Sequence, residues 1–219
     1  MLENVYCKSR GCGTVRLQGM ENFKMKRIIF ASNNAGKIKE VKQIFQDYDV
    51  VSMREAGIEL DVEENGTTFE ENALIKARAV YELTGEITMA DDSGLEVDFL
   101  NKEPGVYSAR YMGHDTSYDI KNQSIIDRLD GVEGEARSAR FVCAIAVCLP
   151  EGKELTSRGT MEGIIAKEIK GNHGFGYDPI VYLPEYQKTS AELSPEEKNK
   201  ISHRGKALEL IRTELVKYI

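Results

Sequence analysis

Apolar and polar residues alternate along the chain in patterns that predict both strands and helices. Residues 36–45 repeat apolar side chains at helical spacing with lysines on the opposite face, and 117–129 is also helical in pattern. Alternation or β-branched content predicts strands at 27–32, 49–53, 139–150 and 154–165. This order indicates a mixed α/β fold, with neither strict βαβ alternation nor a Rossmann glycine fingerprint.

Capping signals predict the ends of two further helices. A Thr followed three residues later by a Glu predicts a helix start at 67–68, and Gly85 ends that helix as a C-terminal glycine. Ser194 as N-cap opens the C-terminal helical segment, with Pro195 at its first position and Glu197 in the capping-box place.

The composition fits a folded α/β protein. The chain has 219 residues, 41% of them hydrophobic, which suits one large domain or two small lobes around a cleft. No apolar run reaches membrane-spanning length, so we expect no membrane partner. The net charge of −7 argues against nucleic acid as a partner. Any polyanion must therefore be held by a local cluster of Lys, Arg and backbone N–H groups.

Residues 1–24 differ from the rest of the chain. They show no apolar periodicity and no signal-peptide core, so we expect a disordered N-terminal extension. Cys7 and Cys12 lack the spacing of a zinc knuckle and a second ligand pair, which favours free thiols in a reducing cytosol. Cys143 and Cys148 share one predicted strand, and their odd spacing should point them to opposite faces.

The segment SNNAGK, residues 32–37, joins the first predicted strand to the first predicted helix. Ser32 stands at the strand end, Gly36 frees the turn, and the helix N-terminus offers unpaired N–H groups at a positive dipole end. Lys37 adds a full charge. This is the outline of a phosphate-binding turn without the P-loop spacing. The alternative is an ordinary N-cap beside a solvated lysine.

Two acidic stretches could hold a cation. Residues 86–98 predict a strand, an acidic turn at Asp91 and Asp92, and a second strand. Carboxylates at a strand end bind Mg²⁺, although alternation along a strand lets only one of the two face a cleft. Solvated acids in an Asx turn are the alternative. The acids of VEENG, residues 62–66, could face the same cation or simply be surface charge.

The segment GNHGFGYDP, residues 171–179, combines glycines with two aromatic residues. Glycines let a flat ligand approach the backbone, and Phe175 or Tyr177 offers a stacking face. The alternative is a tight loop whose aromatics fill the core.

Lys198, His203 and Arg204 crowd the C-terminal helical segment, where His203 taken alone fits a structural role. Together these pieces suit one ligand. A polyphosphate would lie on the SNNAGK turn, a divalent ion on the acids and a planar base on the aromatic loop, with donors beside the base. That ligand is a nucleoside triphosphate.

Six motifs occur in order from Met25 to the C-terminus and leave out residues 1–24. They are FASNNAGKIKEV, TFEENALIKA, ADDSGLEVD, PGVYSARY, GFGYDP and TSAELSPEEKNKISHRGKAL. In these motifs the chain resembles the inosine triphosphate pyrophosphatases, also called XTP/dITP diphosphatases.

The resemblance implies two α/β lobes on a long mixed central β-sheet flanked by helices, with the active-site cleft between the lobes. One domain would span 25–219, as a homodimer in the cytoplasm. The implied activity is Mg²⁺-dependent hydrolysis of ITP, dITP and XTP to the monophosphate and pyrophosphate. That activity would keep deaminated bases out of DNA and RNA.

The resemblance also implies residue roles. Asp92 would be the catalytic base and a metal ligand, Glu63 a second metal ligand, and Glu71 a supporting residue behind the site. Lys198, His203 or Arg204 could donate to the 6-oxo group of the base, and Asp178 or a backbone carbonyl could accept from N1–H. The implied substrate-binding residues are Ser32, Asn33, Asn34, Ala35, Gly36, Lys37, Ser93, Phe175, Gly176, Tyr177, Asp178, Lys198, His203 and Arg204.

Three rival functions are distinguishable by assay. A kinase or nucleotidyltransferase would need an acceptor site, for which the sequence has no recognisable motif. A regulatory nucleotide-binding module would not need the acids of a metal site. A related enzyme for modified pyrimidine nucleotides would share the phosphate site but take a different base.

Overall fold

The computed structural model describes residues 25–219, and the predictions for 1–24, including Cys7 and Cys12, lie outside the described residues. Within them, seven strands form one sheet in the order β2-β1-β3-β4-β5-β6-β7. β1 pairs in parallel with β2 and β3, and the other neighbouring pairs are antiparallel, so the sheet is mixed as predicted. The strands are β1 (Arg27–Phe30), β2 (Asp49–Ser52), β3 (Thr88–Val97), β4 (Ser138–Leu149), β5 (Lys153–Ile165), β6 (Val181–Leu183) and β7 (Lys188–Thr189).

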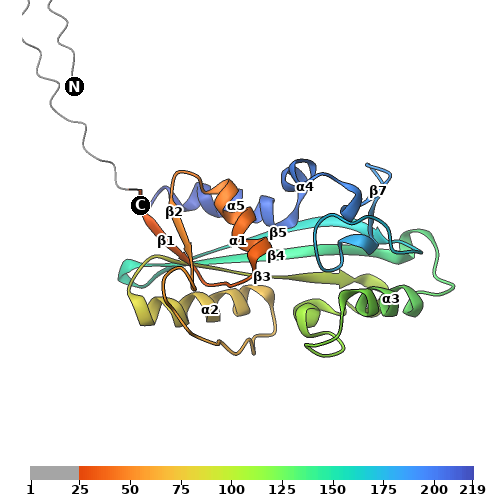
Figure 1. The fold of residues 1–219 in the computed structure, drawn as a ribbon, viewed down its shortest axis with the longest axis horizontal. Coiled ribbons are helices and arrows are strands. Elements are labelled where there is room, and N and C mark those ends of the chain that lie inside the picture. The colour runs from red at the N-terminus through yellow and green to blue at the C-terminus, as the bar shows by residue number, and fades with distance from the viewer. Residues whose placement is uncertain (1–24) are drawn as a thin grey trace, which may run out of the picture.

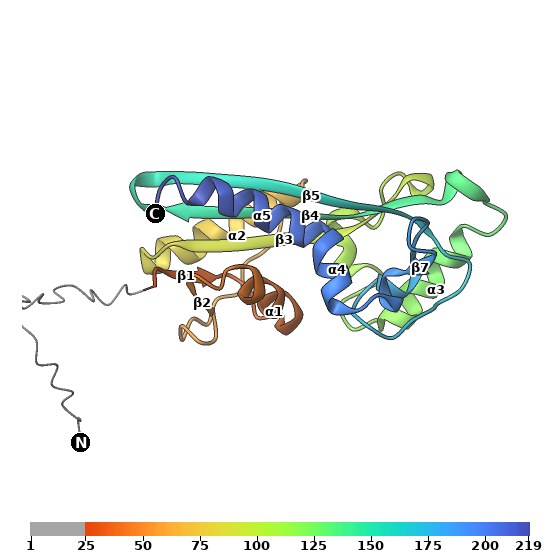
Figure 2. The same ribbon diagram turned by 90° about the horizontal axis from the view of Figure 1, so that it is seen from above.

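β4 and β5 form the pair of long neighbouring strands that the alternation predicts. They are paired along nearly their whole length, and Figure 2 shows both running from one end of the molecule to the other. The free thiols of Cys143 and Cys148 are buried in β4. They pack into clusters on opposite faces of the sheet, which confirms the prediction from their spacing.

The acidic turn predicted within 86–98 is wrong. β3 runs unbroken through Asp91 and Asp92, because it pairs with β4 along its whole length. β1 pairs only with the first two residues of β3. Among the described residues, β3 therefore has no strand neighbour on that edge where the two aspartates lie.

The helices are α1 (Ala35–Ile44), α2 (Phe69–Thr84), α3 (Tyr118–Arg128), α4 (Pro195–Ile201) and α5 (His203–Leu215). α2 begins with a capping box of Thr68 and Glu71 and ends at Gly85 in the left-handed conformation. α4 opens with the predicted capping box of Ser194 and Glu197. None of the helices at 25–219 has the length and apolar character needed to cross a bilayer.

The C-terminal helical segment is interrupted at Ser202. This residue has extended backbone, ends α4, and accepts the backbone N–H of Gly205 on its side-chain oxygen at 2.9 Å as the N-cap of α5. A Cβ at Gly205 would lie 2.3 Å from the carbonyl oxygen of Asn199, so only glycine allows this close turn between the two helices. The break gives α5 its own N-terminus at His203 and Arg204.

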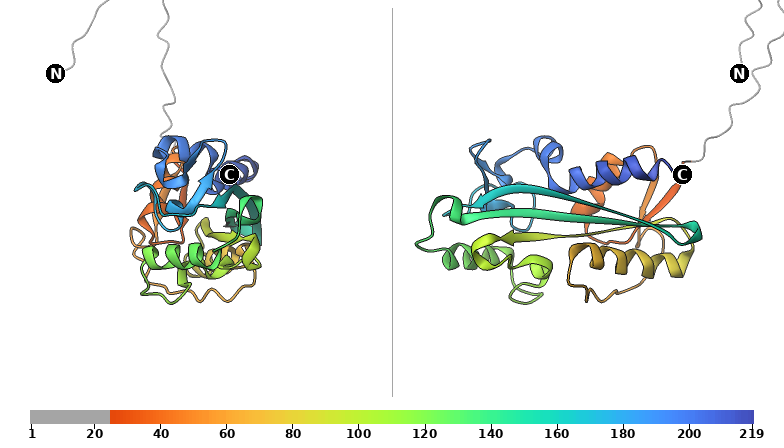
Figure 3. Two further views of the ribbon diagram at one scale, coloured as in Figure 1. Left: turned by 90° about the vertical axis from the view of Figure 1, so that its right-hand side faces the viewer. Right: turned by 180° about the vertical axis from the view of Figure 1, so that it is seen from behind.

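Helices cover both faces of the sheet, α2 and α3 on one side and α1 and α5 on the other (Figures 1 and 3). At one end of the molecule, α1 and α5 bury an apolar cluster against β1, β3 and β4, and α2 buries a second on the opposite face. At the other end, α3 and the segments after β5 enclose a third. The two lobes are joined by β3, β4 and β5 (Figure 2).

Gly159 lets the start of α5 lie directly against β5. A Cβ at this position would lie 2.2 Å from the carbonyl oxygen of His203 and 2.7 Å from the backbone nitrogen of Ala207. Backbone atoms in a helix cannot shift without a large energetic cost. The lack of a side chain at Gly159 therefore fixes how closely the first turn of α5, with His203 and Arg204, packs against β5.

We expect Gly159→Ala to lower the free energy of unfolding by about 1–3 kcal/mol, because the added methyl group overpacks the contact between β5 and α5. Urea unfolding followed by circular dichroism measures this. Thr156→Ala, at an exposed position on the same strand, should change stability by less than about 0.5 kcal/mol. Equal stability of the two variants would show that α5 does not depend on this approach.

Candidate active site

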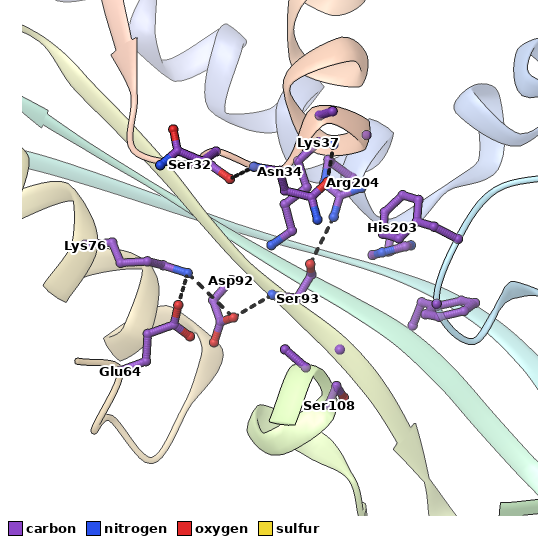
Figure 4. Close-up of a pocket in the computed structure, with 18 of the residues that line it drawn as sticks. Ser32, Asn34, Lys37, Glu64, Lys76, Asp92, Ser93, Ser108, His203 and Arg204 are labelled. Atoms are coloured by element: carbon purple, nitrogen blue, oxygen red, sulfur yellow. Dashed lines mark hydrogen bonds and ion pairs between the residues drawn. The ribbon is translucent and has the colours of Figure 1, made fainter. Parts of the chain in front are cut away.

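A cavity of about 730 Å³ opens where the two lobes meet. Its walls come from the turn before α1, from β3, and from the loops and helices of the other lobe (Figure 4). It brings together Asp92 and every substrate-binding residue that the resemblance implies: Ser32, Asn33, Asn34, Ala35, Gly36, Lys37, Ser93, Phe175, Gly176, Tyr177, Asp178, Lys198, His203 and Arg204.

Glu63, the implied second metal ligand, is not among the lining residues. It is exposed, whereas Glu64 lines the cavity and is partly buried. The carboxylate of Glu64 lies 2.8 Å from the ammonium of Lys76, and its carbonyl accepts from Arg110 at 3.1 Å. These contacts turn Glu64 inward, so Glu64 rather than Glu63 faces the cavity beside Asp92.

Asp92 points to the face of β3 that α2 covers. Its Oδ2 accepts from the Nδ2 of Asn72 at 3.0 Å, and its Oδ1 accepts from the backbone N–H of Ser93 at 2.9 Å. The ammonium of Lys76 lies 3.8 Å from Oδ1 and bridges to Glu64 (Figure 4). Burial raises the pKa of the Asp92 carboxyl above its ordinary value, and the negative charge of Glu64 contributes in the same direction.

Asp91 points to the opposite face and is fully enclosed. Its oxygens lie 3.1 Å from the ammonium of Lys37 and 3.1 Å from Nε of Arg204. Burial alone would raise the pKa of this carboxyl, but the two cations hold it well below its ordinary value. Asp91 is therefore a carboxylate that ties α1 and α5 to the sheet.

The SNNAGK turn forms the N-terminus of α1. The side chain of Asn34 caps the helix by accepting from the backbone N–H of Lys37 at 3.1 Å. The backbone N–H of Asn34 donates to the side-chain oxygen of Ser32 at 3.2 Å. The Lys37 side chain is mostly buried and reaches toward Asp91. Asn34 is therefore an ordinary N-cap, but Lys37 is not the solvated lysine of the alternative, and the turn lines the cavity.

The aromatic loop at 171–179 is held by Asp178, which is buried. Its carboxylate accepts from the backbone N–H of Phe175 at 2.8 Å, from the hydroxyl of Ser190 at 2.8 Å and from the ammonium of Lys198 at 2.6 Å. Through these bonds, the carboxylate of Asp178 stabilises the loop itself. The loop leaves the Phe175 ring 41% exposed, close enough to Gly36 that a Cβ there would lie 3.1 Å from it.

His203 and Arg204 stand at the first turn of α5. The imidazole of His203 stacks on Phe141 with 5.0 Å between ring centroids, and burial lowers its pKa well below the ordinary value. Within residues 25–219, its Nδ1 has no hydrogen-bond partner. Arg204 is almost fully buried and is bound by Asp91, Glu40 and the hydroxyl of Ser93.

Sequence reasoning gave no role to Asn72, Lys76 or Glu40. Asn72 and Lys76 are four residues apart, so they share one face of α2 with the buried Ala73, Ala77 and Val80. A polar pair within an apolar helical stripe is the signal that could have found them. Glu71, expected behind the site, belongs to the capping box of α2 instead.

Glu64 and Asp92 are the residues that could hold a metal. Between residues 25 and 219, no group of three or more His, Cys, Asp or Glu side chains forms a complete metal cage. Mg²⁺ does not require one, because it is usually held by one or two carboxylates, waters and substrate phosphates. The carboxylates of Asp92 and Glu64, which both lie beside the Lys76 ammonium in this cavity, could supply such ligands.

The family model described as the Ham1 family matches residues 28–214. Two relatives are named dITP/XTP pyrophosphatase. The protein of Clostridium perfringens (strain 13 / Type A) is 48% identical over an alignment of 199 residues, which covers 87% of this chain and 98% of its own. That of Bacillus subtilis (strain 168) is 48% identical over 186 residues, 84% of this chain and 94% of its own.

Solved structures with similar sequence share the fold. The structure of the Staphylococcus aureus Ham1 protein is 44% identical, with a TM-score of 0.81 over 89% of this chain and 100% of that one. A Mycobacterium abscessus structure, named nucleoside-triphosphatase / dITP/XTP pyrophosphatase, is 41% identical with a TM-score of 0.70, over 84% of this chain and 98% of that one.

Proposed function

The chain belongs to the Ham1 family, and on that premise we propose that it hydrolyses dITP, XTP and ITP to the nucleoside monophosphate and pyrophosphate. One observation carries the proposal. A single cavity joins a helix N-terminal turn with a lysine, the carboxylates of Asp92 and Glu64, and an exposed aromatic ring. These are the groups that a triphosphate, an attacking water and a purine base require. Such an enzyme would remove deaminated purine nucleotides before they enter DNA and RNA.

The triphosphate would lie on the SNNAGK turn. The free N–H groups at the start of α1 and the ammonium of Lys37 attract negative charge there. Lys37 is already balanced by Asp91, so its position is fixed before the substrate arrives. Groups placed in advance stabilise the charge that develops on the leaving pyrophosphate without reorganisation in the reaction.

Asp92 is the proposed general base. In this role it accepts a proton from water as the water oxygen attacks the α-phosphorus, and the bond from that phosphorus to the bridging oxygen breaks to release pyrophosphate. Asn72 and the N–H of Ser93 orient the carboxylate, and burial raises its pKa toward the range where a carboxylate accepts protons effectively. Lys76 balances the charge of Asp92 and Glu64.

We propose Mg²⁺ as the cofactor, held by Asp92 and Glu64. When bound, the ion would neutralise phosphate charge and polarise the reacting phosphoryl group. Both carboxylates lie near the same ammonium, Glu64 at 2.8 Å and Asp92 at 3.8 Å from Lys76, and this closeness of two carboxylates in one cavity supports the assignment.

Base selectivity would come from hydrogen-bond donors in the lobe that contains α3 and the aromatic loop. Hypoxanthine and xanthine present a 6-oxo acceptor and an N1–H donor, and adenine reverses both groups. Lys198 retains free N–H bonds beside its pair with Asp178 and lies 5.3 Å from the centre of the Phe175 ring, so it is the best placed donor to the 6-oxo group. Because Asp178 is committed to the loop, a backbone carbonyl is the better candidate to accept from N1–H.

The oligomeric state and the cellular location also belong to the proposal. A homodimer is supported by the resemblance and by exposed apolar side chains such as Phe99, Tyr107 and Met112. A cytoplasmic location is supported by the resemblance.

Pyrophosphate release across the common and deaminated triphosphates tests the function. We expect dITP, XTP and ITP to be hydrolysed at least about tenfold more efficiently than ATP, because each mispaired buried group costs about 1–3 kcal/mol. EDTA and the Asp92→Asn variant should each abolish the signal while the fold stays intact. A diphosphate product, or equal rates on all substrates, would contradict the proposal.

The variants Glu64→Gln and Glu63→Gln form a matched pair. Glu64→Gln should lower kcat/KM for ITP at least about tenfold and raise the Mg²⁺ concentration needed for half-maximal rate, because a carboxylate of the cation site is lost. Glu63→Gln should leave both within about twofold, as expected of an exposed residue. The reverse pattern would return the metal role to Glu63.

Phe175→Ala should raise KM for ITP about tenfold, because stacking a base on an aromatic ring is worth about 1–3 kcal/mol. The rate on ribose 5-triphosphate, which has the phosphates but no base, should change little. Tyr186→Ala is the control, since this ring is 40% exposed and lies outside the cavity lining. Equal losses with and without a base would mean that Phe175 does not contact the base.

A further inference from the structure

One face of α3 carries polar side chains into the interior of the second lobe. Tyr118, Lys121 and Asn122 are spaced i, i+3 and i+4, which places them on the same side of the helix. Lys121 and Asn122 are each 1% exposed. Burying an ammonium and an amide is costly unless they form hydrogen bonds, so their partners explain why they are there.

Asn122 bonds to the aromatic loop. Its Nδ2 donates to the carbonyl oxygen of Gly176 at 3.1 Å, between the exposed ring of Phe175 and the buried ring of Tyr177. Gly176 has a φ of +68°, and a Cβ there would lie 3.6 Å from the Tyr118 ring, so the loop crosses close above α3. Asn122 is thus the side chain of α3 that holds the loop backbone at its centre.

The same helix face holds the opposite wall. The ammonium of Lys121 donates to the carbonyl of Ala109 at 2.8 Å and lies 5.0 Å from the centre of the Tyr118 ring. The hydroxyl of Tyr177 donates to the carbonyl of Ser108 at 2.8 Å. The residues at 108–109, the aromatic loop and α3 are therefore linked in a closed set of bonds behind the cavity.

Lys121 is bound through neutral groups. Within residues 25–219, no carboxylate lies at ion-pair distance from its ammonium, and its bonds go to a carbonyl and a ring face. A buried cation held this way contributes little as a charge pair. Its length and donors instead fix the distance between α3 and the wall at 108–109.

We propose, on the basis of the function proposed above, that Asn122 is a positioning residue for the purine base. It fixes the distance between the aromatic loop and α3, and therefore the position of the Phe175 ring over the cavity. It touches neither the phosphate turn nor the carboxylates Asp92 and Glu64. Its effect is on base binding and base choice, while the attack on phosphorus proceeds as before.

The test compares Asn122→Ala with Gln123→Ala, an exposed neighbour on the same helix whose amide bonds to Asp127 instead. With ITP, Asn122→Ala should raise KM about fivefold and change kcat less than twofold, because the loss of one buried hydrogen bond costs about 1 kcal/mol. Its preference for ITP over ATP should fall by a similar factor. With ribose 5-triphosphate, both variants should match the wild type.

Hydrogen exchange supplies a readout that does not depend on turnover. The backbone amides at 174–178 should exchange faster in Asn122→Ala, while those of β3, β4 and β5 keep wild-type protection. Gln123→Ala should leave all of them unchanged. If Asn122→Ala proves unstable, Asn122→Leu keeps a similar volume and removes the donor, and it should show the same local increase and the same rise in KM.

These outcomes distinguish a failure of the Asn122 positioning role from a failure of the proposed function. Wild-type KM and wild-type exchange at 174–178 in both Asn122 variants would overturn the positioning role. So would an equal loss on ITP and ribose 5-triphosphate, which would indicate general disruption of the fold. If the wild-type chain hydrolyses no deaminated purine triphosphate, the proposed function fails, and the exchange result still decides whether Asn122 anchors the loop.

Discussion

Two adjacent carboxylates in the middle of a central strand constrain the rest of this structure. Successive side chains on β3 point to opposite faces, so Asp91 and Asp92 cannot share one cation. Each is buried, and a buried charge without a partner costs several kcal/mol. Lys37 and Arg204 must therefore approach from one face and Lys76 from the other, which fixes the positions of α1, α5 and α2 around the strand.

The cavity follows from the way β1 ends. β1 pairs only with the start of β3, while β4 and β5 carry the sheet onward into a second lobe with its own apolar cluster. The edge of β3 beside the aspartates has no strand neighbour among the described residues, and it forms the floor of the cavity between the two separately packed lobes. In the proposed function, one lobe would supply groups for the phosphates and the other groups for the base, with the nucleotide lying across both.

Local signals in the sequence predicted much of the fold. The capping box at Thr68, the left-handed glycine at Gly85 and the long strand pair all depend on near neighbours in the chain, and the structure has each of them. The acidic turn failed because Asp91 and Asp92 look like loop residues to any local rule. Pairing with β4 and cations from distant helices outweigh that preference, and neither is visible in a short window.

The choice between Glu63 and Glu64 shows the same limit at a single residue. Two neighbouring glutamates are chemically identical, and the segment that carries them has neither helix nor strand to set an alternation. Its register is fixed instead by contacts with distant parts of the chain. Lys76 binds the Glu64 carboxylate, Arg110 binds its carbonyl, and Asn72 accepts the N–H of Gly66. Because Asn72 also donates to Asp92, the residue that orients the proposed base also places the second carboxylate beside it. The acid pair is therefore built as one unit by α2, and a motif read along the chain could not separate its two candidates.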